Sequence, residues 1–144
     1  MSLLNTLTKE WKSGKDIGLL LIRFIFAFAL IYGHGWGKIT TIFSGQEIQF
    51  MDPIGLGATT SFYLAAFAEF ICALLLIFGL CTRFASIVLI INFLVIVGLH
   101  AFTFNDAFEV MEPRIFYLFT FVALFFSGSG KYSLDHLFFN KRNQ

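Results

Sequence analysis

Charged side chains are scarce in this 144-residue sequence, at 13% of its residues against about 25% in an average soluble domain. Hydrophobic residues make up 58%, compared with about 45–50% in such a domain. The composition excludes an ordinary soluble fold and predicts an integral membrane protein in a lipid bilayer. The net charge is only +1, so nothing indicates a nucleic-acid partner and we expect none.

Cysteine is rare in the sequence, and the common catalytic motifs are missing. The two cysteines, Cys72 and Cys81, lie on one predicted helix about 13.5 Å apart along its axis, too far for a disulfide. No Cys-x-x-Cys, P-loop, GxSxG, HExxH or dinucleotide fingerprint occurs. These absences argue against a thiol redox centre within the chain, and we expect no metal and no evident haem or flavin site.

Long apolar runs are what the sequence does contain. The clearest, FYLAAFAEFICALLLIFGL, has 19 residues, enough to cross the ~30 Å hydrocarbon core of a bilayer at ~1.5 Å per residue. We predict an all-α fold: a single transmembrane domain over 1–144 built as a four-helix bundle. The predicted helices are 17–36, 61–80, 83–102 and 113–127. The second and third form a tight hairpin, and the loop at 39–59 folds back as a lid.

The basic residues predict the orientation of these helices. Lysines and arginines outside the predicted hydrocarbon core number seven on one side and two on the other. By the positive-inside rule, both termini are expected in the cytoplasm. The seven are Lys9, Lys12, Lys15, Arg83, Lys131, Lys141 and Arg142, and the two are Lys38 and Arg114.

Polar residues within the predicted helices form the candidate site. Glu69 lies near mid-membrane, where an unpaired charge costs at least ~2.5 kcal/mol on insertion scales. Counting ~1.5 Å per residue from the inner boundary allows an Arg23–Glu69 ion pair with Asn92 nearby. Two alternatives stay open: Glu69 is a polar lock that only fixes helix packing, and Arg23 snorkels to the inner headgroups.

A second polar group lies near the outer ends of the predicted helices. Its members are His34, Lys38, His100 and Arg114. His34 shares one helix face with Arg23, and His100 lies at a similar depth on another helix. The two histidines could bind quinone carbonyls, relay protons or ligate a metal, or they could be interfacial residues without a ligand.

Three motifs of the sequence, LIRFIFAFALIYGHGWGK, AAFAEFICALLLIFGLCTR and GSGKYSLD, resemble the signatures of the DoxX family over nearly the whole chain. The resemblance implies a four-helix, multi-pass protein of the bacterial cytoplasmic (inner) membrane. It also implies a relation to the small subunits of thiosulfate:quinone oxidoreductase or terminal quinol oxidase systems. Family membership constrains the fold more than the function.

We therefore interpret the chain as a membrane-embedded accessory subunit of a quinone-linked oxidoreductase system. Glu69, His34 and His100 are the candidates for proton transfer. The residues expected to bind the quinone are Arg23, His34, Lys38, Asn92, His100 and Arg114. A membrane-protein partner or a second copy of the chain is expected. A non-catalytic scaffold or assembly factor and a small-molecule or proton conductor remain as alternatives, and the sequence leaves open whether the chain is itself catalytic.

Overall fold

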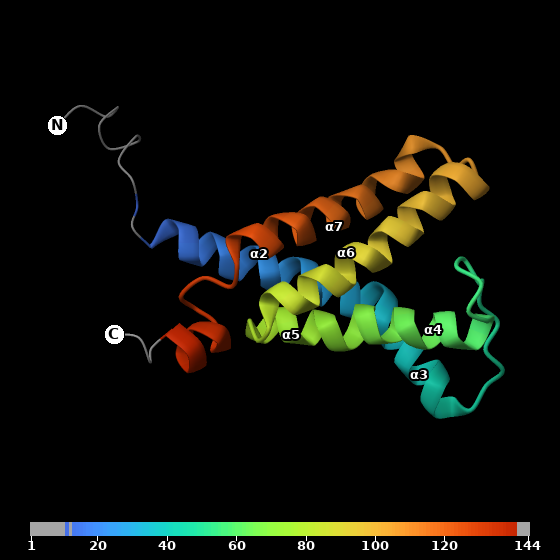
Figure 1. The fold of residues 1–144 in the computed structure, drawn as a ribbon, viewed down its shortest axis with the longest axis horizontal. Coiled ribbons are helices and arrows are strands. Elements are labelled where there is room, and N and C mark those ends of the chain that lie inside the picture. The colour runs from blue at the N-terminus through green and yellow to red at the C-terminus, as the bar shows by residue number, and fades with distance from the viewer. Residues whose placement is uncertain (1–10, 12, 141–144) are drawn as a thin grey trace.

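The computed structural model describes Trp11 and residues 13–140, and every regular element within them is helical. Four helices are long and apolar enough to cross a membrane. The predicted all-α transmembrane bundle of four helices is therefore confirmed (Figure 1), and the chain is a multi-pass membrane protein. The four spans are Gly14–Ser44, Ala58–Phe78, Thr82–Thr103 and Phe108–Ser127.

Three of the four spans contain a π-helical turn, in which the helix is wider than a regular α-helix. The first span comprises α2 (Gly14–Leu30), η1 (Ile31–Gly35) and α3 (Trp36–Ser44). The second comprises α4 (Ala58–Ala66), η2 (Phe67–Cys72) and α5 (Ala73–Phe78). The third comprises α6 (Thr82–Gly98) and η3 (Leu99–Thr103). The fourth is α7 (Phe108–Ser127), and the π-helical η4 (His136–Asn140) follows it.

Two of the predicted helix bounds are wrong. The first helix continues past its expected end at 36 to Ser44, because the glycine-rich stretch there stays helical and the left-handed turn comes only at Gly45 (φ 66°). The fourth helix begins at Phe108 rather than 113, with Pro113 inside it. The second and third helices match the prediction within a few residues, and the predicted lid loop is reduced to 45–57.

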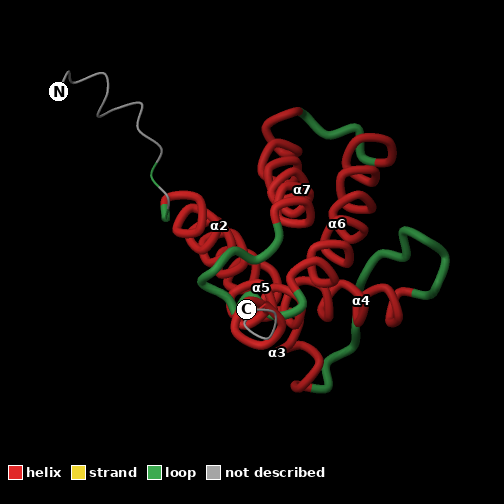
Figure 2. Tube along the Cα trace, turned by 60° about the vertical axis from the view of Figure 1, so that its left-hand side comes forward, coloured by secondary structure: helices red, strands yellow, loops and turns green. Residues whose placement is uncertain are grey.

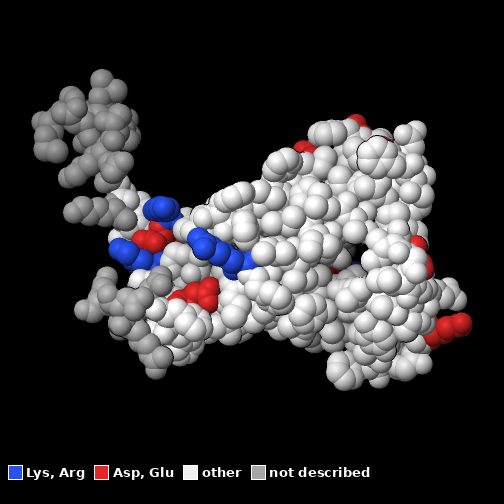
Figure 3. All heavy atoms as spheres, in the orientation of Figure 1, with Lys and Arg blue, Asp and Glu red and all other residues white. Residues whose placement is uncertain are grey.

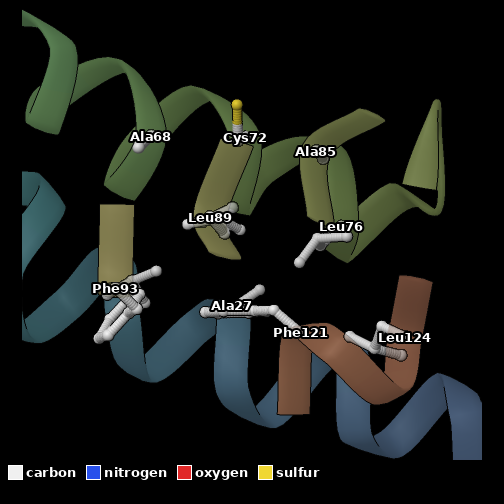
Figure 4. Close-up of a cluster of buried hydrophobic side chains, with 11 residues drawn as sticks. Ala27, Ala68, Cys72, Leu76, Ala85, Leu89, Phe93, Phe121 and Leu124 are labelled. Carbon is white, nitrogen blue, oxygen red and sulfur yellow. The ribbon is translucent and has the colours of Figure 1, made fainter. Parts of the chain in front are cut away.

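The spans meet in a core of small and aliphatic side chains. Figure 4 shows Ala27, Ala68 and Ala85 beside larger residues such as Leu89 and Phe121, drawn from all four spans. Helices in a bilayer gain little from burying apolar surface, so small side chains that allow close van der Waals contact favour their packing. Within this core α2 lies against α5, and α6 lies against α7.

The segment after α7 closes one end of the bundle, the end at which α2 begins and η4 lies (Figure 1). The Asp135 carboxylate accepts hydrogen bonds from the backbone N–H groups of Cys81 (2.7 Å) and Thr82 (2.9 Å). The backbone N–H of Asp135 donates to the carbonyl oxygen of Gly79 (2.9 Å). Asp135 thus caps the first turn of α6, whose N–H groups have no partner within the helix. We call this the closed end.

Charged side chains on the face shown in Figure 3 gather at the two ends of the molecule, and the belt between them is uncharged. Basic side chains concentrate at the closed end, where Arg83 and Lys131 line one crevice with Asp16 and Asp135. An uncharged belt between two charged ends is the surface expected of a protein embedded in a bilayer.

Candidate functional site

A cavity of about 680 Å³ lies away from the closed end, where α6 and α7 diverge from α4 (Figures 1 and 2). All four spans and the loop at 45–57 contribute to its wall, which is mostly aliphatic and aromatic. Figure 3 shows the surface hollowed in this half of the molecule. Apolar cavities of this size with a few convergent polar groups are typical ligand sites. The polar lining residues are His34, Lys38, Ser61, Glu69, Asn92, His100, Arg114 and Tyr117.

Glu69 is held by two partners inside this cavity. Lys38 Nζ donates to Glu69 Oε2 at 2.5 Å, and Asn92 Nδ2 donates to Glu69 Oε1 at 3.2 Å. Only 4% of the Glu69 side chain and 17% of the Lys38 side chain are exposed. The buried carboxylate is therefore compensated by an opposite charge, as an intramembrane acid requires.

The predicted Arg23–Glu69 ion pair is wrong, because Arg23 lies at the closed end. Arg23 is fully buried, and its Nη2 donates to the Tyr132 carbonyl oxygen at 2.6 Å. Its guanidinium occupies the space beside Gly79, about 15 Å along the second span from Glu69. An arginine side chain cannot cover that distance, and complete burial also excludes snorkelling to the headgroups. The depth count failed because it set the start of the first helix level with the end of the second, whereas Arg23, nine residues into α2, lies beside Gly79 at the end of the second span.

Lys38 reaches Glu69 because η1 and η2 pack with their backbones in contact. A Cβ atom at Gly35 would lie 2.5 Å from the carbonyl oxygen of Glu69, closer than real Cβ contacts occur. Next to this contact, the ring centroids of Trp36 and Phe70 are 6.2 Å apart. A glycine at position 35 is therefore the residue that allows the first two spans to meet at the cavity floor.

The candidate proton-transfer residues all lie in π-helical turns. His34 is in η1, Glu69 is in η2 and His100 is in η3. Isolated π-helical turns within α-helices occur frequently at functional sites. Each of these three cavity residues therefore lies where the backbone departs from a regular α-helix.

The loop at 45–57 forms part of the cavity wall, as expected of the predicted lid. The Asp52 carboxylate holds this loop against α4 by accepting hydrogen bonds from Gly57 N (2.8 Å), Leu56 N (2.9 Å) and Ser61 Oγ (3.0 Å). These bonds, that from Gly57 foremost, lower the pKa of Asp52 from its ordinary value of 3.8, so it stays ionised at neutral pH. The loop residues that line the cavity are Phe50, Met51, Pro53 and Ile54.

The other predicted site residues lie in the same cavity. His34 and His100 line it from the first and third spans, and Arg114 lines it from the fourth. His100 Nδ1 lies 2.6 Å from Asp106 Oδ2. Arg114 donates to the Val110 carbonyl oxygen one turn earlier in α7. Among the predicted site residues, Arg23 is the one that lies elsewhere.

Three features of the site were not predicted from the sequence. Lys38 is the ion-pair partner of Glu69, Asp106 contacts His100, and Tyr117 lines the cavity with its ring stacked on Phe93 at 5.1 Å. The spacing of four between His34 and Lys38 would reveal their shared face if the first helix were extended. Tyr117 has no comparable signal, because the sequence is rich in aromatic residues throughout.

Comparisons with known proteins bear on the fold and on part of the cavity. The family model described as DoxX matches residues 18–106, more than half of the chain. The match includes nearly all of the first three spans and the cavity residues that they carry, while α7 and the GSGKYSLD motif lie outside it. No curated protein and no solved structure matches the chain.

Proposed function

The chain belongs to the DoxX family, and we propose that it is a membrane-embedded subunit of a quinone-linked oxidoreductase system that holds a quinone headgroup in the cavity. A partner membrane protein supplies the electron-carrying cofactor, and the chain supplies the headgroup site. The proposal includes a location in the bacterial cytoplasmic (inner) membrane, where the family resemblance places such subunits.

The observation that carries the proposal is the convergence of polar groups in one apolar cavity. Lys38 comes from the first span, Asn92 and His100 come from the third, and Arg114 comes from the fourth. Lys38 has donor capacity beyond its bond to Glu69, because an ammonium group carries three N–H bonds. The donors of Lys38 and Arg114 match the two oxygens of a quinone ring, while the apolar wall suits the ring itself and the start of its isoprenoid tail.

The charges around Glu69 also fit a polar headgroup that carries no charge. The Lys38–Glu69 pair is internally neutral, and Asn92 extends it with an amide. Glu69 can exchange a proton with a ligand only if its contact with Lys38 is loosened, so proton transfer through Glu69 would be coupled to movement of Lys38. In this proposal Glu69 is the proton carrier and His34 and His100 contact the headgroup oxygens.

The test is quinone retention in purified protein reconstituted in native-lipid nanodiscs. His34→Ala and His100→Ala should each lower the total amount of bound quinone, oxidised and reduced forms together, about tenfold, the loss expected for one hydrogen bond worth ~1.5 kcal/mol. The stability of both variants should change by less than about 1 kcal/mol, because neither side chain compensates the buried Glu69.

His136→Ala is the matched control, since His136 lies at the closed end and does not line the cavity. It should leave quinone retention unchanged. Wild-type protein without bound quinone, or His34→Ala and His100→Ala variants that lose stability but retain quinone, would contradict the proposal. Co-purification of a large complex without a retained quinone would favour a scaffold or assembly role instead.

A further inference from the structure

The imidazole of His100 is oriented by a contact outside the cavity. Its Nδ1 lies 2.6 Å from Asp106 Oδ2, and the backbone N–H of Asp106 donates to the His100 carbonyl oxygen at 3.0 Å. The left-handed backbone at Asn105 (φ 52°) turns the chain back so that both contacts form. Asp106 is therefore attached to His100 by side chain and backbone together.

This contact determines which ring nitrogen carries the proton. An ionised carboxylate can only accept a hydrogen bond, so the neutral imidazole must place its hydrogen on Nδ1. Nε2 is then left with a lone pair, and it is the ring nitrogen available to a ligand in the cavity that His100 lines. His100 consequently presents a hydrogen-bond acceptor to the ligand.

The other cavity groups do not impose the same requirement. The Glu69 carboxylate can only accept, but both of its oxygens already accept hydrogen bonds from Lys38 and Asn92. Lys38 and Arg114 present donors, and both a quinone carbonyl and a quinol hydroxyl have an oxygen lone pair to accept from them. His34 has no hydrogen-bond partner among the residues that the structure describes, so either of its tautomers can form. A quinol hydroxyl can donate to Nε2 of His100, whereas a quinone carbonyl would place two lone pairs against each other.

We infer that the cavity binds the quinol form of its ligand more tightly than the quinone form, and that Asp106 is the positioning residue for this preference. The inference rests on the proposed function, because it assigns a redox state to the headgroup that the cavity holds. One hydrogen bond gained by the quinol corresponds to a preference of about tenfold. Tighter binding of the reduced form raises the two-electron midpoint potential of the bound couple by about 30 mV.

The experiment uses the full chain in nanodiscs and a short-tailed benzoquinone with its quinol, kept anaerobic at pH 8. Dissociation constants for both forms are measured by titration, and the midpoint potential of the bound couple is measured independently. Wild-type protein should favour the quinol about tenfold. Asp106→Asn removes the charge that holds the proton on Nδ1, so both tautomers become available and the ratio should fall toward one.

Glu109→Gln is the matched control, because Glu109 is an exposed acid in the first turn of α7 that does not line the cavity. It should keep the wild-type ratio and potential. Equal affinities in the wild type, or an unchanged ratio in Asp106→Asn, would overturn the inference and leave the proposed function standing. Saturable binding of neither form would overturn the proposed function together with the inference.

Discussion

Glu69 and Lys38 form the buried ion pair of the cavity. The carboxylate is almost fully buried, and the ammonium at 2.5 Å is its compensating charge. Removing one partner of a buried ion pair leaves the other uncompensated, which is far more costly than replacing both with neutral groups. This asymmetry distinguishes a true pair from two independent polar residues.

Lys38→Met should lower the free energy of unfolding by about 3–5 kcal/mol, because it leaves the Glu69 carboxylate without its counter-charge. The double variant Lys38→Met with Glu69→Gln should recover much of this loss. The measurement is a double-mutant cycle by reversible unfolding in mild detergent. A double variant that loses as much as the two single variants combined would show that the pair is not coupled.

Arg23→Met supplies the control for this cycle. Arg23 lies at the closed end, away from Glu69, so its effect should simply add to that of Glu69→Gln. Coupling between Arg23 and Glu69 larger than about 0.5 kcal/mol would instead support the ion pair predicted from the sequence.

The sequence identified the buried acid but assigned it the wrong partner. Glu69, Asn92 and His100 stand out because polar residues are rare in apolar runs, and the structure places all three in the cavity. To predict the partner of Glu69, one must know the relative depth of residues on different helices. That depth depends on where each helix begins and on how far the first span extends past the glycines, which composition and periodicity do not specify.

At the scale of the helices, the contact between η1 and η2 determines how the first two spans cross. Gly33, Gly35 and Gly37 form a row in the sequence, yet only Gly35 faces the backbone of another helix. A row of glycines permits a close approach of another backbone, but it does not indicate which glycine makes the contact. The π-helical turns change the rotation of each helix, so a count at 3.6 residues per turn cannot predict which glycine faces inward.

Gly35→Ala should lower the free energy of unfolding by about 1–3 kcal/mol, because the added methyl group must displace the Glu69 backbone. Gly33→Ala and Gly37→Ala are matched controls, since a Cβ atom at either position has open space around it. These two variants should be neutral or slightly stabilising, as alanine favours helix over glycine. Thermal unfolding of the three variants measures the difference, and three equal effects would contradict the proposed role of Gly35.

At the scale of the whole molecule, the charge distribution bears on orientation. The two basic residues counted on the non-cytoplasmic side, Lys38 and Arg114, lie in helices and line the cavity rather than a loop. The structure describes three of the seven residues expected in the cytoplasm, namely Lys15, Arg83 and Lys131. The other four, Lys9, Lys12, Lys141 and Arg142, lie outside the described residues.

We expect the closed end to face the cytoplasm, because basic residues favour that side of the membrane. In a cysteine-free background, Glu47→Cys in the loop at 45–57 should react with an impermeant maleimide added to intact cells. Gln144→Cys should react only after the cells are permeabilised. The reverse pattern would mean that the protein is inserted in the opposite orientation.

A π-helical turn accommodates one residue more than the α-helix around it, and in η2 this turn contains Glu69. Each residue rotates an α-helix by about 100°. Deleting one residue after Glu69 within η2 would leave α5 packed on α2, while rotating the acid by that angle away from Lys38. The deletion of a single codon is therefore a very small genetic change that would remove the charge pair from the cavity while α5 keeps its place in the bundle.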